Sequence, residues 1–191
     1  VGYGVHAPEA GWDDFKDVDL KGKVAVFLVN DPDFEAQAGD DAKGRFGDRR
    51  MTYYGRWTYK FEEAARQGAT AAIIVHDTEP AAYPWAVVQS SWTGEQYELS
   101  APNDHMDQSQ AIGWMQLDSA KALFASAGQD FAALSKAAAV KGFRAVPLSG
   151  VTMSVGFDNT IRKSLSHNVI GVLPGTTAPN DYVLYSAHWD H

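Results

Sequence analysis

The sequence of 191 residues contains no cysteine and has few basic side chains. Without cysteine there is no disulfide framework, and no thiolate can serve as nucleophile or metal ligand. Lysine and arginine number 16 against 24 acidic residues, which leaves a net charge of −8. This balance argues against nucleic acid as a partner, because phosphate binding needs a basic face. No apolar run approaches the length of a membrane span.

Several functional signatures are also missing. The sequence has no Gly-x-Ser-x-Gly elbow of a serine hydrolase and no glycine-rich phosphate-binding loop. Asp31, Asp33 and Glu35 resemble the start of a calcium loop, but Ala36 stands where that loop needs glycine, and Ala42 where it needs glutamate. We therefore expect a solvated loop of mixed charge, whose acids could at most contribute to an irregular cation site.

Apolar periodicity and capping residues predict three helices. In the first, apolar side chains recur at i, i+4, i+7 and i+8 from Trp57, and Gly68 is placed to end the helix. Asp118 and Asp130 are good N-cap residues for the other two. The predicted helices are 56–67, 118–127 and 130–139.

Short apolar runs predict the strands. Residues 24–29 form a short continuous run, which suits a strand covered on both faces. Residues 69–76 predict another buried strand, and residues 111–117 predict a further strand. Residues 151–157 alternate apolar and polar side chains, which suits one wet face. Further strands are expected at 160–165, 168–173 and 182–187, and the last two should be antiparallel because only eight residues connect them.

A His-x-Asp pair follows the last predicted strand. Side chains alternate along a strand, so His188 and Asp190 would project to the same face, where imidazole and carboxylate suit zinc. Without context, such a pair is more often a hydrogen-bonded surface pair. His76 ends an earlier strand, and we expect it to be structural, since no second ligand lies at local metal spacing.

Two segments carry a family resemblance. Residues 168–175 (NVIGVLPG) followed by 185–190 (YSAHWD) resemble the start of the catalytic domain of the aminopeptidase and glutamate carboxypeptidase group of zinc exopeptidases. Upstream, Gly22-Lys23 before a strand, and a helix running into the strand of residues 68–75, resemble the protease-associated domain inserted in that group. The resemblance covers essentially the whole chain.

The resemblance implies an α+β fold with two parts. Residues 1–147 would form a protease-associated domain with a mainly β, partly barrel-like core flanked by helices. Residues 148–191 would supply return strands and the first antiparallel strand pair of an α/β zinc peptidase domain. Because Val1 already reads as strand and the chain stops at the His-x-Asp-His cluster, we expect an internal piece of a longer protein.

By the same resemblance, His188 would be the first zinc ligand, and Asp190 the catalytic-site carboxylate that orients the imidazole. The parent protein would use two zinc ions to hydrolyse peptides near a free N-terminus. His191 follows the motif where the family often has a small residue. One histidine and one carboxylate are too few ligands for a zinc site, so we expect this chain alone to have no peptidase activity and at most weak affinity for zinc.

The resemblance also implies partners and a location. Tyr83 and Trp85, with the pair Arg49-Arg50, are candidate substrate-binding residues, because the protease-associated domain covers the active-site mouth. The partner would be a peptide substrate, and the protein would be periplasmic or secreted. The alternative is a non-catalytic binding module, as in receptor-like relatives that keep the fold and lose the metals.

Overall fold

The computed structural model describes residues 2–188, and the chain divides into two compact units, Val1–Met153 (unit 1) and Ser154–His191 (unit 2). All helices and strands of the described residues lie in unit 1. In chain order they are β1 (His6–Ala7), the 3-10 helix η1 (Pro8–Ala10), β2 (Trp12–Asp13), β3 (Val24–Leu28), α1 (Trp57–Arg66), β4 (Ala71–His76), α2 (Thr78–Ala81), α3 (Trp85–Trp92), β5 (Ala111–Gln116), α4 (Leu117–Ser126) and α5 (Phe131–Ala138).

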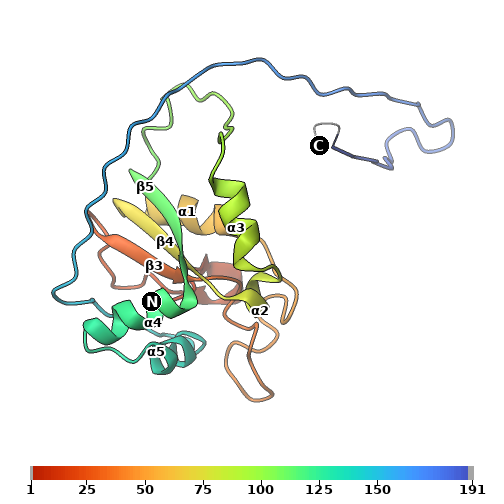
Figure 1. The fold of residues 1–191 in the computed structure, drawn as a ribbon. Helices are drawn as coiled ribbons and strands as arrows, with labels where there is room; N and C mark the ends of the chain where they lie inside the picture. The colour runs from red at the N-terminus through yellow and green to blue at the C-terminus, as the bar shows by residue number, and fades with distance from the viewer. Residues whose placement is uncertain (1, 189–191) are drawn as a thin grey trace. The chain divides into compact units, whose positions relative to one another are not determined.

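A three-stranded parallel sheet organises unit 1 (Figure 1). The strand order is β3-β4-β5, with Val24 opposite Ala71, and Ala71 opposite Ala111. Parallel neighbours need long crossovers, and here α1 lies in the first crossover while α2 and α3 lie in the second. The sheet therefore steps one strand at a time in sequence order. Its carboxyl edge is formed by the ends of β3, β4 and β5.

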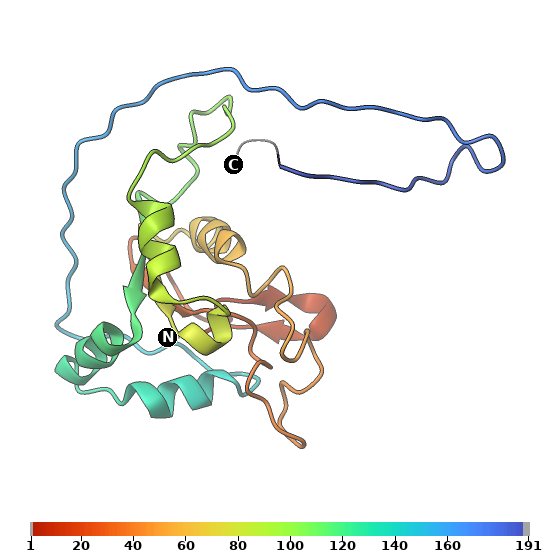
Figure 2. The ribbon, with the colours of Figure 1, turned by 45° about the vertical axis from the view of Figure 1, so that its right-hand side comes forward.

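The sheet is buried on both faces. One face presents Phe27 and Ile74, with Trp114 packed against them, to a core that includes Phe61 of α1. The other face presents Leu28, Val75 and Met115 to a core containing Ala120 and Phe124 of α4 together with Phe131 and Ala138 of α5. Figure 2 shows α4 and α5 on the opposite side of the sheet from α1. This double covering explains why β3 and β4 read as continuous apolar runs.

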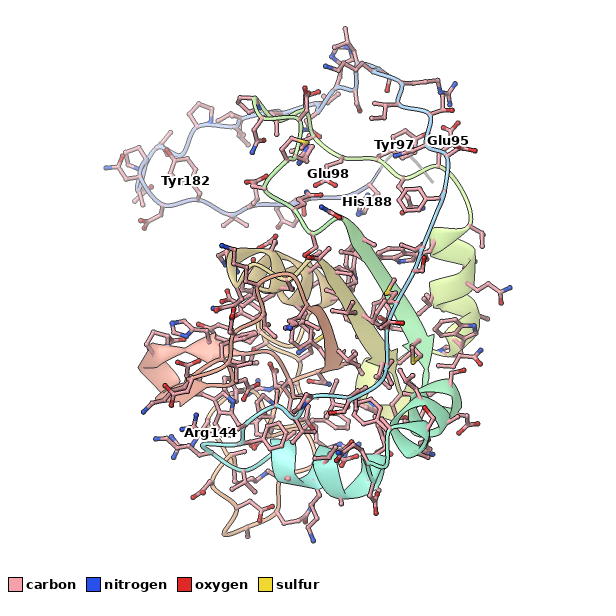
Figure 3. The ribbon with its side chains drawn as sticks, turned by 90° about the vertical axis from the view of Figure 1, so that its left-hand side faces the viewer. Glu95, Tyr97, Glu98, Arg144, Tyr182 and His188 are labelled. Carbon is pink, nitrogen blue, oxygen red and sulfur yellow. The ribbon has the colours of Figure 1, made fainter. Side chains whose placement is uncertain are left out.

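The segment after α5 returns to the N-terminal part of unit 1. Arg144, labelled in Figure 3, pairs with Asp17 at 2.8 Å and donates to the carbonyl of Lys16 at 3.2 Å. The two-stranded antiparallel pair of β1 and β2 belongs to the same N-terminal region, where His6 lies opposite Asp13. Among residues 2–188, no helix has the length and apolar character needed to cross a bilayer.

The expectation of a mainly β, partly barrel-like core is wrong for the described residues. The described residues form an open parallel sheet with helices on both faces and no closed barrel. The reason lies in the connections: helix-containing crossovers make neighbouring strands parallel and place helices over the sheet, whereas a small barrel of meandering strands needs short turns. The coarser expectation of a fold that mixes helices with strands is confirmed.

The predicted strands after residue 150 are not formed in the described part of the chain. Residues 151–157, 160–165, 168–173 and 182–187 contain no strand, and the apolar side chains there are exposed, with Leu173 96% accessible. A strand needs a neighbour for its backbone groups, and an isolated hairpin is marginal in water. Nothing among the described residues of unit 2 supplies such a sheet.

The helix predictions hold to within one or two residues. Helices α1, α4 and α5 occupy the predicted ranges, and Asp130 caps α5 by accepting from the backbone N–H of Ala133 at 3.1 Å. The cap predicted at Asp118 is wrong, because α4 begins at Leu117 directly after β5, and Asp118 lies in its first turn. Helices α2 and α3 occupy an aromatic-rich stretch between β4 and β5 that none of the three predicted helices covers.

Candidate functional site

A pocket of about 540 Å³ opens at the carboxyl edge of the sheet. Ligands of open α/β folds bind at this edge, because the loops that follow the strands surround it. Its floor is apolar and includes the ends of β3 and β4 and the first turns of α4 and α5. The residues that line it are Tyr3, Leu28, Val29, Phe34, Glu35, Ala36, Gln37, Asp40, Val75, Asp77, Pro80, Leu117, Lys121, Phe131, Ala132, Ser135, Lys136, Ala139 and Val140.

The acidic and the basic side chains of the pocket come from different structural elements. Glu35 and Asp40 come from the loop after β3, and Asp77 follows β4, so the acidic side chains come from the sheet edge and its loop. Lys121 lies on α4 and Lys136 on α5, so the basic side chains come from the helical wall. A ligand in this pocket would meet carboxylates on one side and ammonium groups on the other.

Ser135 adds an unsatisfied hydroxyl to the helical wall. Its Oγ is buried and has no hydrogen-bond partner, and the residue is one of those that line the pocket. A serine in the middle of a helix usually bonds back to the carbonyl four residues earlier. Since Ser135 does not, its hydroxyl remains available as a donor or acceptor, and leaving it unpaired costs free energy.

A buried lysine holds the segments next to the pocket. The ammonium of Lys60, fully buried, donates to the carbonyls of Tyr3 and Asn30, the latter at 3.0 Å. Burial lowers the pKa of Lys60 to about 8, while Asp31 and Asp14 act in the opposite direction. Because Lys60 ties the N-terminal segment and the end of β3 to α1, its role is structural positioning of the pocket wall.

Asp14 is a buried acid whose charge interacts with that of Lys60. Its carboxylate accepts from the backbone N–H of Val5 at 3.1 Å and from the indole N–H of Trp12 at 2.7 Å. Burial raises the pKa of Asp14 to about 6, and the hydrogen bonds and Lys60 only partly offset that effect. Burial therefore shifts the pKa of the acid Asp14 upward and that of the base Lys60 downward, so both values move toward neutral pH.

The loop after β3 is anchored by two buried acids, which we had expected to be solvated. Asp31 accepts from the backbone N–H and the hydroxyl of Thr52, at 2.6 and 2.9 Å, and burial raises its pKa. Asp33 accepts from the backbone N–H of Phe46 at 2.9 Å and of Asp48 at 3.0 Å. The expectation is wrong for these two side chains, because each satisfies backbone donors of the same loop; Glu35, Asp40 and Asp41 are exposed as expected.

Neither of these acids belongs to a metal-ligand cluster. The second oxygen of Asp33, Oδ1, is buried without a hydrogen-bond partner. Nevertheless, residues 2–188 contain no group of three or more histidine, aspartate or glutamate side chains arranged to hold a metal ion. The loop acids thus organise the backbone.

Tyr83 and Trp85 surround His76 and do not line the pocket. The rings of both residues lie 5.6 Å from the imidazole, and its Nε2 donates to the carbonyl of Tyr83 at 3.0 Å. His76 is buried at the end of β4, with Trp114 of β5 as a third aromatic neighbour at 6.2 Å. This packing agrees with the structural role expected for His76.

His188 lies on unit 2 and is exposed (Figure 3). Asp190, its predicted partner, lies outside the described residues. The structure therefore leaves the pairing of these two side chains as a prediction. One histidine and one carboxylate do not meet the three or four protein ligands of a zinc site, so this chain's described residues do not by themselves fit zinc.

Lys60 and Ser135 are among the site residues that the sequence analysis did not identify. Lys60 lies three residues after Trp57 and Ser135 four residues after Phe131, so each occupies the apolar stripe of its helix. A polar side chain on such a stripe is the signal that could have identified both.

No family model, curated protein or solved structure matches this chain.

Proposed function

We propose that this chain is the protease-associated domain, together with the first segment of the catalytic domain, of a secreted or periplasmic zinc exopeptidase of the aminopeptidase type. One observation carries the proposal. The apolar strand patterns of unit 2 lead directly to the His-Trp-Asp motif, and their side chains are exposed, with Val169, Leu173 and Leu184 each more than 85% accessible. Such segments are typical of strands that are completed by a sheet.

In this proposal each motif residue has one role. His188 is a zinc ligand, and Asp190 orients its imidazole by accepting a hydrogen bond from the other ring nitrogen. The ions would supply Lewis-acid chemistry when all ligands are present. Unit 1 would cover the active-site mouth, where Tyr83 and Trp85 are candidates for contacts with a peptide substrate.

The first test uses the 191-residue chain itself. We expect no hydrolysis of leucine p-nitroanilide with or without added zinc, because the sequence offers too few ligands. Metal-dependent hydrolysis by this chain would contradict the proposed division of ligands.

The second test uses a protein in which the sequence continues into a complete peptidase domain. His188→Ala should reduce hydrolysis below detection, and Asp190→Asn should reduce it about 10- to 100-fold, as for partners of metal ligands. His167→Ala, an exposed histidine of the same unit, is the matched control and should leave the rate unchanged. An inactive parent protein, or an unaffected His188→Ala variant, would refute the proposal.

A non-catalytic binding module is the second candidate. It is favoured by the pocket of unit 1, which lies at a typical ligand-binding edge and is built without the His-x-Asp motif. Hydrolysis by the complete protein discriminates between the two functions, since only the peptidase requires it.

A further inference from the structure

We infer that the pocket of unit 1 binds a small zwitterion with an apolar side chain, of the size of a dipeptide. The inference goes beyond the proposed function, because every residue involved lies between Tyr3 and Val140, and neither His188 nor zinc takes part. It rests on three features: the position and size of the pocket, the separation of its charges, and the unsatisfied hydroxyl of Ser135.

The pocket has the dimensions and floor of a small-molecule site. Its volume of about 540 Å³ lies within the 300–1,000 Å³ typical of such sites. Leu28, Val75, Leu117 and Phe131 contribute to an apolar floor. This floor would accommodate an aliphatic side chain, whose burial supplies part of the binding free energy.

The acidic wall suits an ammonium group. Glu35, Asp40 and Asp77 line it, and within residues 2–188 none of them forms an ion pair with a basic side chain. Asp77 precedes α2 without its side chain capping that helix. Nearby acids also contribute to raising the pKa of Tyr3, Glu35 most strongly among them after burial, so the Tyr3 hydroxyl stays protonated beside this wall.

The helical wall suits a carboxylate. Lys136 forms no ion pair in the described chain, and Lys121 is paired only with Asp118 of its own helix, at 3.6 Å with both side chains exposed. An exposed pair of this kind is weak and can be exchanged for a ligand. The Ser135 hydroxyl, buried and unpartnered, would donate to the same carboxylate.

The two walls together select a zwitterion. A simple anion would meet the carboxylates of the acidic wall, and a simple cation would meet the lysines of the helical wall. A molecule with both charges satisfies both walls at once, because the acids and the lysines of the pocket are not paired with each other.

Binding of L-leucyl-L-leucine to the 191-residue chain, followed by calorimetry and by amide chemical shifts, tests the inference. We expect saturable binding at millimolar or lower concentration, with shifts at residues of α5 and of the loop around Glu35. N-acetyl-leucyl-leucine, which lacks the ammonium, and leucyl-leucine amide, which lacks the carboxylate, should each bind about tenfold or more weakly. Inorganic phosphate should not compete.

Variants separate the pocket from the rest of the surface. Ser135→Ala should weaken binding about tenfold, the effect of removing one hydrogen bond to a charged group, and it should fold because alanine favours helix. Lys136→Gln should weaken it about threefold. Ser126→Ala is the matched control, since that hydroxyl donates to the carbonyl of Leu123 and lies outside the pocket.

Three results would overturn the inference: no saturable binding of the dipeptide, equal binding of either blocked analogue, or unchanged affinity in Ser135→Ala. Binding of phosphate in place of the dipeptide would show instead that the helical wall acts as a simple anion site. The assay requires neither zinc nor hydrolysis, so a failure here is distinguishable from a failure of the peptidase proposal.

Discussion

At the scale of single residues, burial decides what the charged side chains do. Lys60 and Asp14 would be ordinary surface charges by residue type, yet Lys60 is fully buried and Asp14 is 7% exposed. Each is satisfied by hydrogen bonds that involve backbone groups: Lys60 donates to two carbonyls, and Asp14 accepts from the N–H of Val5. Desolvation then lowers the pKa of the base and raises that of the acid.

The raised pKa of Asp14 predicts a dependence of stability on pH. The folded protein binds this proton below about pH 6, whereas a carboxyl with the ordinary pKa of 3.8 binds it only in more acidic solution. Between these values the folded state holds more protons, so this group's contribution to the free energy of unfolding rises as the pH falls from 7 to 4. The gain should be on the order of 2–3 kcal/mol.

Urea unfolding of the wild type and of Asp14→Asn at pH 7 and pH 4 measures this contribution. The wild type should gain stability relative to the variant at the lower pH, because the variant has no carboxyl to protonate. Asp41→Asn, an exposed site with the same change of charge, is the control. A constant difference between wild type and Asp14→Asn across this range would contradict the prediction.

At the scale of elements, the long loop between β3 and α1 is held by its own acids. Asp33 accepts from the backbone N–H groups of Phe46 and Asp48, and Asp31 accepts from Thr52. These bonds substitute for secondary structure, since buried backbone donors must be paired. The pocket residues Glu35 and Asp40 lie in this loop, so its anchoring also places the acidic wall.

Asp33→Ala should loosen this loop without unfolding the sheet. Loss of the two bonds should increase hydrogen exchange at the amides of Phe46 and Asp48 about tenfold or more, while the amides of β4 keep their protection. Exchange measured by NMR tests this, with Asp41→Ala as the exposed control in the same loop. Unchanged exchange at both amides would show that Asp33 does not anchor the loop.

At the scale of the whole molecule, the two units differ in how they are stabilised. Unit 1 has a sheet with apolar cores on both faces. The described residues of unit 2 have no helix or strand, and among their backbone groups one turn bond is formed, from the N–H of Asp181 to the carbonyl of Ala178 at 3.1 Å. Exposed apolar side chains there therefore contribute little to folding.

This difference predicts the course of limited proteolysis. Trypsin should first cleave after Arg162 and Lys163, because an extended, exposed segment fits a protease site whereas a buried helix does not. The remaining N-terminal fragment should keep the thermal unfolding midpoint of the intact chain to within a few degrees. Mass spectrometry and a thermal melt of the fragment measure both. Early cleavage within α1, or a large drop in the midpoint, would contradict this account.

Local patterns were enough to predict much of unit 1. The helices α1, α4 and α5 follow from apolar spacing and from the cap at Asp130, and β3, β4 and β5 follow from short apolar runs. The same patterns failed after residue 150, because a strand depends on its neighbour, and periodicity indicates only that a segment suits a sheet.

What the sequence by itself determined about this protein is the position of most helices and strands, the absence of cysteine chemistry and the acidic balance, since each depends only on residue type and spacing. The parallel arrangement of the sheet, the burial of Lys60, Asp31 and Asp33, and the pocket beside Ser135 were decided by the tertiary structure. The physical reason is that burial and pairing join residues far apart in the chain, such as Lys60 with the carbonyl of Tyr3, and no local pattern records those contacts.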